Sequence, residues 1–153
     1  MRWIALCPLL ALSFLAAAEG RPPRTTLRAH LETNSQDGPV FSNAIRTQSG
    51  REVAIQKTPA LSEHDVVAMT PYRANDGTFG ALFQLDEHGQ LALDTLSVER
   101  RGTHLHIFVN GRPVSEMLID RRVKDGKLYL PSGLTAPEIA QMQKDWPTRA
   151  RKK

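Results

Sequence analysis

Three stretches of the chain place apolar side chains at every second position. They are residues 25–31, 52–58 and 79–85, in which Leu, Ala, Val, Ile or Phe recur with that period. Alternation over four to eight residues is typical of a strand with one buried face. The pattern therefore predicts three β-strands, each with one side in the core.

The segment between residues 61 and 72 permits two interpretations. Ser62 and Asp65 have the spacing of a short capping box, which starts a helix. Alternatively, a turn at residues 62–64 leads into a strand over residues 65–72. We favour the turn and strand.

Helix signals follow at Asp86. Asp is a good N-cap, Glu87 lies in the first turn where the helix dipole favours a negative charge, and Gly102 is a stop signal. These residues predict a helix from Asp86 to Arg100 or Arg101. Its apolar face has the members Gly89, Ala92, Leu93 and Leu96.

A β-hairpin is the clearest local prediction. Asn110-Gly111 separates residues 103–109 from residues 112–119, and both turn residues accept the positive φ of a type I′ turn. The alternation places Leu105, Ile107 and Val109 on one strand face and His104, His106 and Phe108 on the other. We expect the histidine face to be exposed.

The last elements are a strand around Leu128–Leu130 and a second helix. Thr135 and Glu138 form a full capping box, with Pro in the first turn, which predicts a helix to about Lys144. Runs of strands with only two helices indicate the α+β class. We expect one domain over residues 25–146, a mixed or antiparallel sheet with two helices on one face, ferredoxin-like, with residues 25–72 as a β-rich N-terminal extension.

The first residues have the pattern of a signal peptide. Trp3–Leu15 is almost wholly apolar, and Ala16 and Ala18 satisfy the small-x-small rule of signal peptidase. We predict a signal peptide over 1–18, cleaved after Ala18, a linker over 19–24 and a periplasmic or secreted protein. The apolar run is shorter than the ~20 residues of a spanning helix. An uncleaved anchor in the inner membrane is the alternative.

Charge is concentrated at the other end of the chain. The 153 residues include 20 Lys+Arg and 16 Asp+Glu, and Arg149, Arg151, Lys152 and Lys153 supply much of the excess. A basic tail over residues 147–153 is either solvated or in contact with acidic lipid headgroups. The balance elsewhere and an aromatic content of 6% exclude a nucleic-acid partner.

Metal chemistry has one weak candidate. His104 and His106 lie on one strand face, and a third ligand would have to come from elsewhere, such as His88 or Glu116. Cys7, the single cysteine, lies in the predicted signal peptide and excludes a multi-cysteine site. We therefore expect neither a metal nor a cofactor.

Carboxylates give no stronger case for catalysis. Asp86 and Glu87 fit helix capping, Asp94 fits a solvated helix face, and Asp120 precedes Arg121 and Arg122 in a local charge pairing. We expect no catalytic residue.

Three segments carry a family resemblance. Phe83–Gln90 matches a strand, an acidic residue and a Gly before a helix. Arg100–Ile119 matches a Gly, a strand, a tight turn and a second strand. Asp125–Ala140 matches a strand, a turn at Gly133 and a helix start. In this order the segments resemble the head subdomain of the first periplasmic domain of SecD, an accessory subunit of the bacterial protein-export translocase, over residues 80–143.

Two places in the chain depart from the family pattern. Asn110 replaces the usual turn aspartate, and residues 115–117 replace the usual Ser-Ala-Pro. The resemblance implies an α+β head domain that binds unfolded or partner protein in the periplasm.

We expect a non-enzymatic exported module that binds exported chains or translocase components, as a strand added to a sheet edge or in a helix–sheet groove. A metal-dependent or hydrolytic enzyme using His104 and His106 is one alternative. An envelope structural protein anchored by its basic tail is the other.

Overall fold

The computed structural model describes residues 23–34, 38 and 40–148. The predicted signal peptide, with Ala16 and Ala18, and the basic residues of the predicted tail lie outside these residues, and both stay predictions. The described chain is an α+β structure, as predicted. Its elements are β1 (Leu27–Thr33), β2 (Ser42–Arg46), β3 (Glu52–Gln56), β4 (Leu61–Ser62), the 3₁₀ turn η2 (Glu63–Asp65), β5 (Val66–Arg73), β6 (Phe79–Leu85), α1 (Glu87–Glu99), β7 (His104–Val109), β8 (Arg112–Leu118), β9 (Lys127–Leu134) and α2 (Ala136–Asp145).

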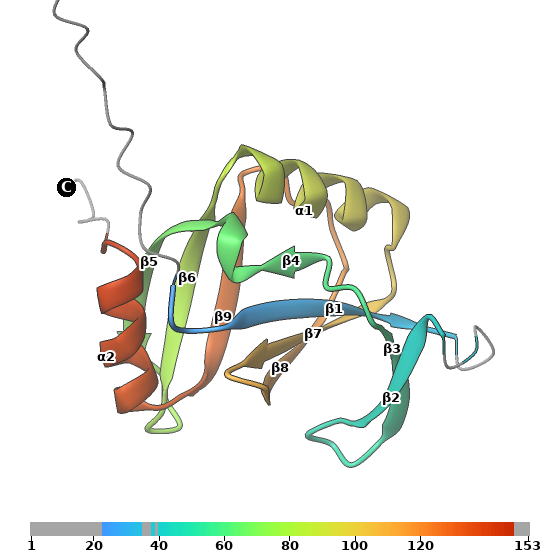
Figure 1. Ribbon diagram of the computed structural model, residues 1–153, viewed down its shortest axis with the longest axis horizontal. Coiled ribbons are helices and arrows are strands. Elements are labelled where there is room, and N and C mark those ends of the chain that lie inside the picture. The colour runs from blue at the N-terminus through green and yellow to red at the C-terminus, as the bar shows by residue number, and fades with distance from the viewer. Residues whose placement is uncertain (1–22, 35–37, 39, 149–153) are drawn as a thin grey trace, which may run out of the picture.

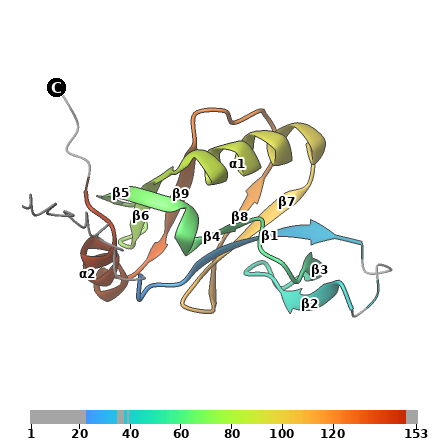
Figure 2. The same ribbon diagram turned by 45° about the horizontal axis from the view of Figure 1, so that its top comes forward.

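The strands divide into two antiparallel sheets, whereas the sequence led us to expect one. The larger sheet has the order β2-β3-β1-β7-β8, with β4 also paired to β1, and the smaller has the order β5-β6-β9. Helix α1 contacts β4, β6 and η2, and α2 contacts β5. Figures 1 and 2 show the two helices at different places around the sheets.

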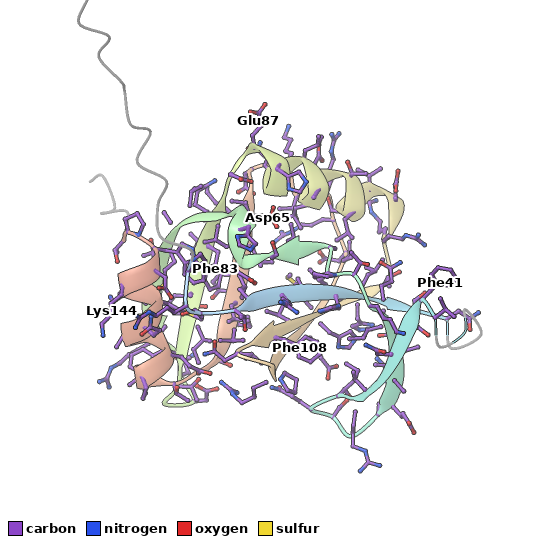
Figure 3. The ribbon with its side chains drawn as sticks, viewed as in Figure 1. Phe41, Asp65, Phe83, Glu87, Phe108 and Lys144 are labelled. Carbon is purple, nitrogen blue, oxygen red and sulfur yellow. The ribbon has the colours of Figure 1, made fainter. Side chains whose placement is uncertain are left out.

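The core lies where the two sheets and the helices meet. Strand β1 contributes Leu27, Ala29 and Leu31, all at most 2% exposed, which confirms the alternation predicted for that strand. Phe83 of β6 is fully buried and meets Trp146 edge to face at 6.0 Å between ring centroids. Figure 3 shows Phe83 inside the molecule and Phe41 at its far end.

The β7–β8 hairpin corrects one expectation. Leu105, Ile107 and Val109 are buried as predicted, but His106 on the opposite face is also buried. The loop between β2 and β3 reaches across to this hairpin, because the amide of Gln48 donates to the Glu116 carboxylate and its side chain donates to Val114 O. The alternation of residues within one strand does not indicate that a loop from elsewhere in the chain packs on it.

Turns and caps shape the segments that border the site. Asn110 and Gly111 both have positive φ, at 50° and 76°. The Asp86 carboxylate accepts from the Gly89 amide at the start of α1. Thr135 and Glu138 form a reciprocal capping box at the start of α2, and Gly102, after α1, has a φ of 88°.

Glu138 also holds a cation from the hairpin. Arg112 donates to both carboxylate oxygens of Glu138, at 2.9 and 2.8 Å. Burial alone would raise the pKa of Glu138, but hydrogen bonds from Thr135 and Arg112 outweigh it and lower that pKa. The start of α2 is thereby fixed to the first residue of β8.

Candidate functional site

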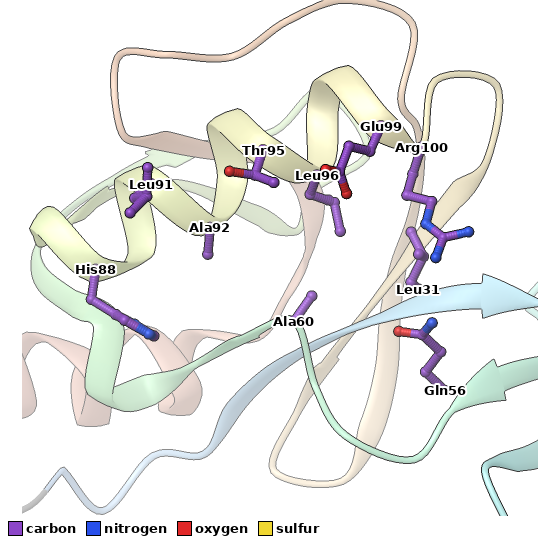
Figure 4. A pocket seen from close by; sticks show the side chains of 10 residues that line it. All are labelled: Leu31, Gln56, Ala60, His88, Leu91, Ala92, Thr95, Leu96, Glu99 and Arg100. Atoms are coloured by element: carbon purple, nitrogen blue, oxygen red, sulfur yellow. The ribbon is translucent and has the colours of Figure 1, made fainter.

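Two grooves border helix α1. The first, here the α1–β4 groove, has a volume of about 340 Å³ and is lined by Leu31, Gln56, Ala60, His88, Leu91, Ala92, Thr95, Leu96, Glu99 and Arg100 (Figure 4). The second, here the β8–β9 groove, has a volume of about 480 Å³ and is lined by Leu82, Leu93, Ser97, Leu105, Met117, Leu118, Ile119, Asp120, Arg121, Val123, Asp125, Lys127, Leu128 and Tyr129.

The β8–β9 groove lies between the edges of the two sheets. Strand β8 ends the larger sheet and β9 ends the smaller one. The two strands touch at one end, where Arg112 donates to Gly133 O at 3.0 Å and a side chain on Gly133 would meet Val114 O at 3.0 Å. Only glycine suits this contact, because Gly133 also has a φ of 95°. Away from this contact, the groove is lined by residues of both strands.

Apolar side chains dominate the walls and the mouth of the β8–β9 groove. Leu105 and Leu128 are buried in it. At the mouth, Leu118 is 51% exposed and Tyr129 is 52% exposed. Exposed large apolar side chains beside a groove are typical of a binding surface.

The charges around the β8–β9 groove are of both signs. Lys127 lies 3.5 Å from Asp125, and Arg121 lies 4.0 Å from Asp120. Since each cation has an acidic neighbour, this rim has no single sign of charge. The groove therefore favours apolar side chains over a strongly charged ligand.

A stack of aromatic rings supports Tyr129. The Tyr72 ring stacks on Tyr129 with centroids 5.6 Å apart and an interplanar angle of 6°. The Tyr72 hydroxyl donates to Leu130 O at 2.6 Å. Tyr72 comes from β5, so its ring crosses β6 at Gly80 to reach β9. This contact fixes the orientation of the β9 wall.

The α1–β4 groove is smaller and more polar at its ends. Leu96 and Ala60 line its middle, His88 lies at one end, and Glu99 and Arg100 lie at the other (Figure 4). Leu91 of α1 lines it while 66% exposed. The groove is a helix–sheet groove of the kind the sequence analysis considered.

A cluster of Asp65, Asp86 and His88 lies at the start of α1. Its ligand-type atoms lie within 4.8 Å of one another. Asp65 accepts from the backbone and hydroxyl of Ser62 and pairs with His88 Nδ1 at 2.7 Å. Asp86 caps the helix. Both carboxylates thus already serve local structure, so the cluster gives no support for a metal site.

The Asp65–His88 pair shifts both of its pKa values. Burial would raise the pKa of Asp65, but hydrogen bonds from Ser62 and His88 lower it overall. The hydrogen bond to Asp65 raises the pKa of His88 above 6.5. The His88 contribution to stability is therefore present at low pH and is lost as pH rises through its raised pKa. The Asp65 contribution is present above its unfolded pKa and is lost as pH falls through its lowered one.

We expect Asp65→Asn to move the pKa of His88 down towards 6.5, because the variant removes the negative partner. An NMR titration of the His88 ring measures the shift. Asp145→Asn, at a carboxylate that bonds Thr25 instead, is the matched control and leaves the His88 pKa unchanged. An unchanged His88 titration in Asp65→Asn contradicts the pairing.

His104 and His106 lie beside Glu32, and not beside His88 or Glu116, the two partners that the sequence analysis considered. Glu32 of β1 lies 3.4 Å from His104 Nδ1 and 3.2 Å from His106 Nε2, both measured to Oε2. His88 pairs with Asp65, and Glu116 accepts from Gln48. Sequence analysis missed Glu32 because the β1–β7 pairing, which brings it there, joins distant parts of the chain.

Two of the carboxylates singled out from the sequence, Asp94 and Asp120, lie beside arginines. Asp94 of α1 binds Arg122 through two hydrogen bonds, the longer at 2.7 Å, which hold the pKa of Asp94 below its usual range. Asp120 neighbours Arg121, as the local charge pairing predicted. Leu118 and Tyr129 were not singled out from the sequence, and their only signal is that each is a large apolar residue at a polar-facing strand position.

None of the helices in the described part of the chain has the length and apolar character to cross a membrane.

Comparison with known proteins gives a fold. No protein-family model matches the chain, and no curated protein matches it. It is similar to a crystal structure of SecDF in its super-membrane-facing form, with a TM-score of 0.57 and 14% identity over 83% of this chain and 20% of that one. A second SecDF structure, described as a membrane component that enhances protein export, is similar with a TM-score of 0.57 and 13% identity. That match covers 83% of this chain and 66% of the SecDF chain.

The chain thus spans less than two thirds of the first SecDF chain, and 66% of the second. The likeness is wider than the 80–143 segment that the motifs suggested, because 83% coverage includes part of residues 25–72. The chain has a SecD-like fold.

Proposed function

We propose that this chain is a non-enzymatic, extracytoplasmic module that binds an extended polypeptide segment in the β8–β9 groove. The observation that carries the proposal is an apolar groove between the edge strands of two sheets. An extended peptide satisfies its backbone at a strand edge and inserts alternate side chains into adjoining pockets. Unfolded polypeptide has both the free backbone and the apolar side chains for such a site.

Strand β8 offers the better edge for pairing. Gln48 covers its first half by donating to Pro113 O and Val114 O. The second half, with Met117 and Leu118, borders the groove. A bound strand along this half would place side chains between Leu118 and Tyr129. Pairing at the edge supplies affinity with little sequence selectivity, which suits a module that binds many chains.

A role in protein export follows from two supporting observations. The fold resembles SecDF, a component described as enhancing protein export. The first 18 residues have the pattern of a signal peptide, which would carry the chain across the inner membrane. We infer that its polypeptide ligands are exported chains or translocase components.

The binding site is tested with Leu118→Glu and Tyr129→Glu. Both side chains are half exposed, so neither change opens a cavity in the core, and a charge at the groove mouth opposes apolar insertion. Circular dichroism checks that each variant is folded, since Tyr129 also stacks on Tyr72. We expect each variant to bind a fluorescently labelled peptide of alternating apolar and polar residues roughly tenfold more weakly or worse. Fluorescence anisotropy measures the affinity.

Two further variants serve as comparisons for this experiment. Val98→Glu, at a half-exposed position of α1 outside both grooves, should bind like the parent chain. Leu91→Glu alters the α1–β4 groove instead. Loss of binding in Leu91→Glu with full binding in Leu118→Glu would reject the β8–β9 groove. A photocrosslinker at position 118, used in the native envelope, tests the export role by identifying the captured proteins.

A further inference from the structure

Two segments that are 120 residues apart in the chain are joined beside α2. The Thr25 amide and hydroxyl both donate to Oδ2 of Asp145, at 2.9 and 2.7 Å. The Met69 amide donates to Pro147 O at 3.3 Å. Trp146, which lies between these two acceptor residues in the sequence, is 4% exposed and belongs to the core. The start of β1 and the end of α2 are therefore fixed together at one end of the molecule (Figure 1).

Positive charge is concentrated in the two segments that meet there. Residues 19–24 and 144–153 together hold seven Lys or Arg and two Asp or Glu, whereas residues 25–143 hold twelve and fourteen. Arg24 and Lys144 are exposed, and Figure 3 shows Lys144 at the end of the molecule opposite Phe41. The fold thus joins two basic segments that the sequence keeps apart. We call them the basic end; its cations are Arg21, Arg24, Lys144, Arg149, Arg151, Lys152 and Lys153.

The carboxylates that the structure places beside this end serve the fold itself. Burial alone would raise the pKa of Asp145, but hydrogen bonds from Thr25 and Arg24 outweigh it and lower that pKa. Glu63 accepts from the amide of the first residue of β1, and its Oε2 lies 4.0 Å from Arg28 Nε. Seven cations against two acidic residues leave the basic end with an excess of positive charge.

We propose that the basic end binds the surface of a membrane that contains anionic lipids. Clusters of roughly four to eight Lys or Arg beside a bilayer are typical of such binding, and each cation near an anionic surface strengthens it several-fold. The segment over residues 19–24 has two cations, and the segment over residues 144–153 has five. A lipid surface presents many phosphates over a wide area, so it suits cations on two short segments that need not converge on one point.

The sequence before the basic end favours a membrane over a nucleic acid. Residues 3–15 are almost wholly apolar and have the pattern of a signal peptide, which a membrane holds during export. The six residues 19–24 span at most about 20 Å when extended, so Thr25 starts out close to the bilayer. The Thr25–Asp145 contact brings the end of α2 to the same place. This step rests on the extracytoplasmic location proposed above.

Vesicle co-sedimentation tests the proposal on the chain from Glu19 onward, which contains every element of the described structure. We expect binding to vesicles of equal parts phosphatidylglycerol and phosphatidylcholine, and roughly tenfold weaker binding or less to phosphatidylcholine alone. Added salt should weaken the binding, because it screens the charges. Replacing the four basic residues of the 149–153 segment by Gln should reduce the affinity roughly tenfold or more. Circular dichroism establishes that the chain and each variant are folded.

A second pair of variants tests whether the two joined segments act together. Arg21→Gln with Arg24→Gln removes two charges from the first segment and should weaken binding to the anionic vesicles roughly tenfold. Arg100→Gln with Arg101→Gln is the matched control, because it removes the same charge from exposed residues after α1. Figure 1 shows the end of α1 on the other side of the molecule from the end of α2. The control should bind like the parent chain.

Four outcomes overturn the proposal. Equal binding to anionic and neutral vesicles would exclude an electrostatic contact with lipid. Full binding by the folded Arg21 and Arg24 variant would show that the joined segments do not act together. Equal losses in that variant and in the Arg100 and Arg101 control would show that net charge alone decides the binding. Binding to double-stranded DNA as tight as to the anionic vesicles, at the same salt and phosphate concentration, would make the basic end a general polyanion site.

Discussion

Replacing Phe83 by alanine is expected to lower the free energy of unfolding by about 3–5 kcal/mol, the usual cost of a large cavity in a core. Phe83 is 0% exposed and packs edge to face on Trp146, which follows α2. The cavity would therefore loosen the contact between β6 and the C-terminal helix as well as remove buried area. Urea denaturation followed by circular dichroism measures the change.

Phe41→Ala is the matched control for this experiment. Phe41 is 71% exposed, so its loss should change stability by less than about 0.5 kcal/mol. Equal effects of the two substitutions would contradict the central position of Phe83.

Gly80→Ala is expected to cost about 3 kcal/mol, at the upper end of the range for over-packing. A methyl group at this position would lie 2.5 Å from the carbonyl of Pro131 and in conflict with the Tyr72 ring. The ring can rotate away, but the carbonyl belongs to the backbone of β9 and cannot. Thermal or urea unfolding measures the loss, and weaker peptide binding should accompany it, since Tyr72 supports Tyr129.

Gly102→Ala provides the comparison for Gly80→Ala. Gly102 has a positive φ of 88° but open space around it, so only backbone strain opposes alanine, at about 1 kcal/mol. A cost at position 80 no greater than that at position 102 would rule out the close approach of β5, β6 and β9 described above.

Local signals in the sequence predicted the local structure well. The Asn110-Gly111 turn and the start of α1 at Asp86 depend on residues close together in the chain, and both elements are present. The strand after η2 and the strand around Leu128 are also present, the latter longer than predicted. Turn chemistry and capping are decided within a few residues, which explains this success.

What the sequence could not predict depends on which strands meet. Alternation identifies a strand but not its neighbour, so the division into two sheets and the groove between their edges were not foreseen. The burial of His106 and its meeting with Glu32 have the same cause. The family resemblance supplied the shared fold, and the structural likeness extends over 83% of the chain.

Strand β1 lies in the middle of the larger sheet, yet it comes first among the strands of the described residues. Its main partner, β7, comes after β6 and α1, and Thr25 bonds Asp145, which is 120 residues away. Such long-range pairing slows folding, because a large loop must close before the contacts between β1 and β7 form. When the chain is delivered N-terminus first, by a ribosome or a membrane channel, Leu27, Ala29 and Leu31 lack their β7 neighbours until most of the described domain has emerged. During that interval they are available to a chaperone.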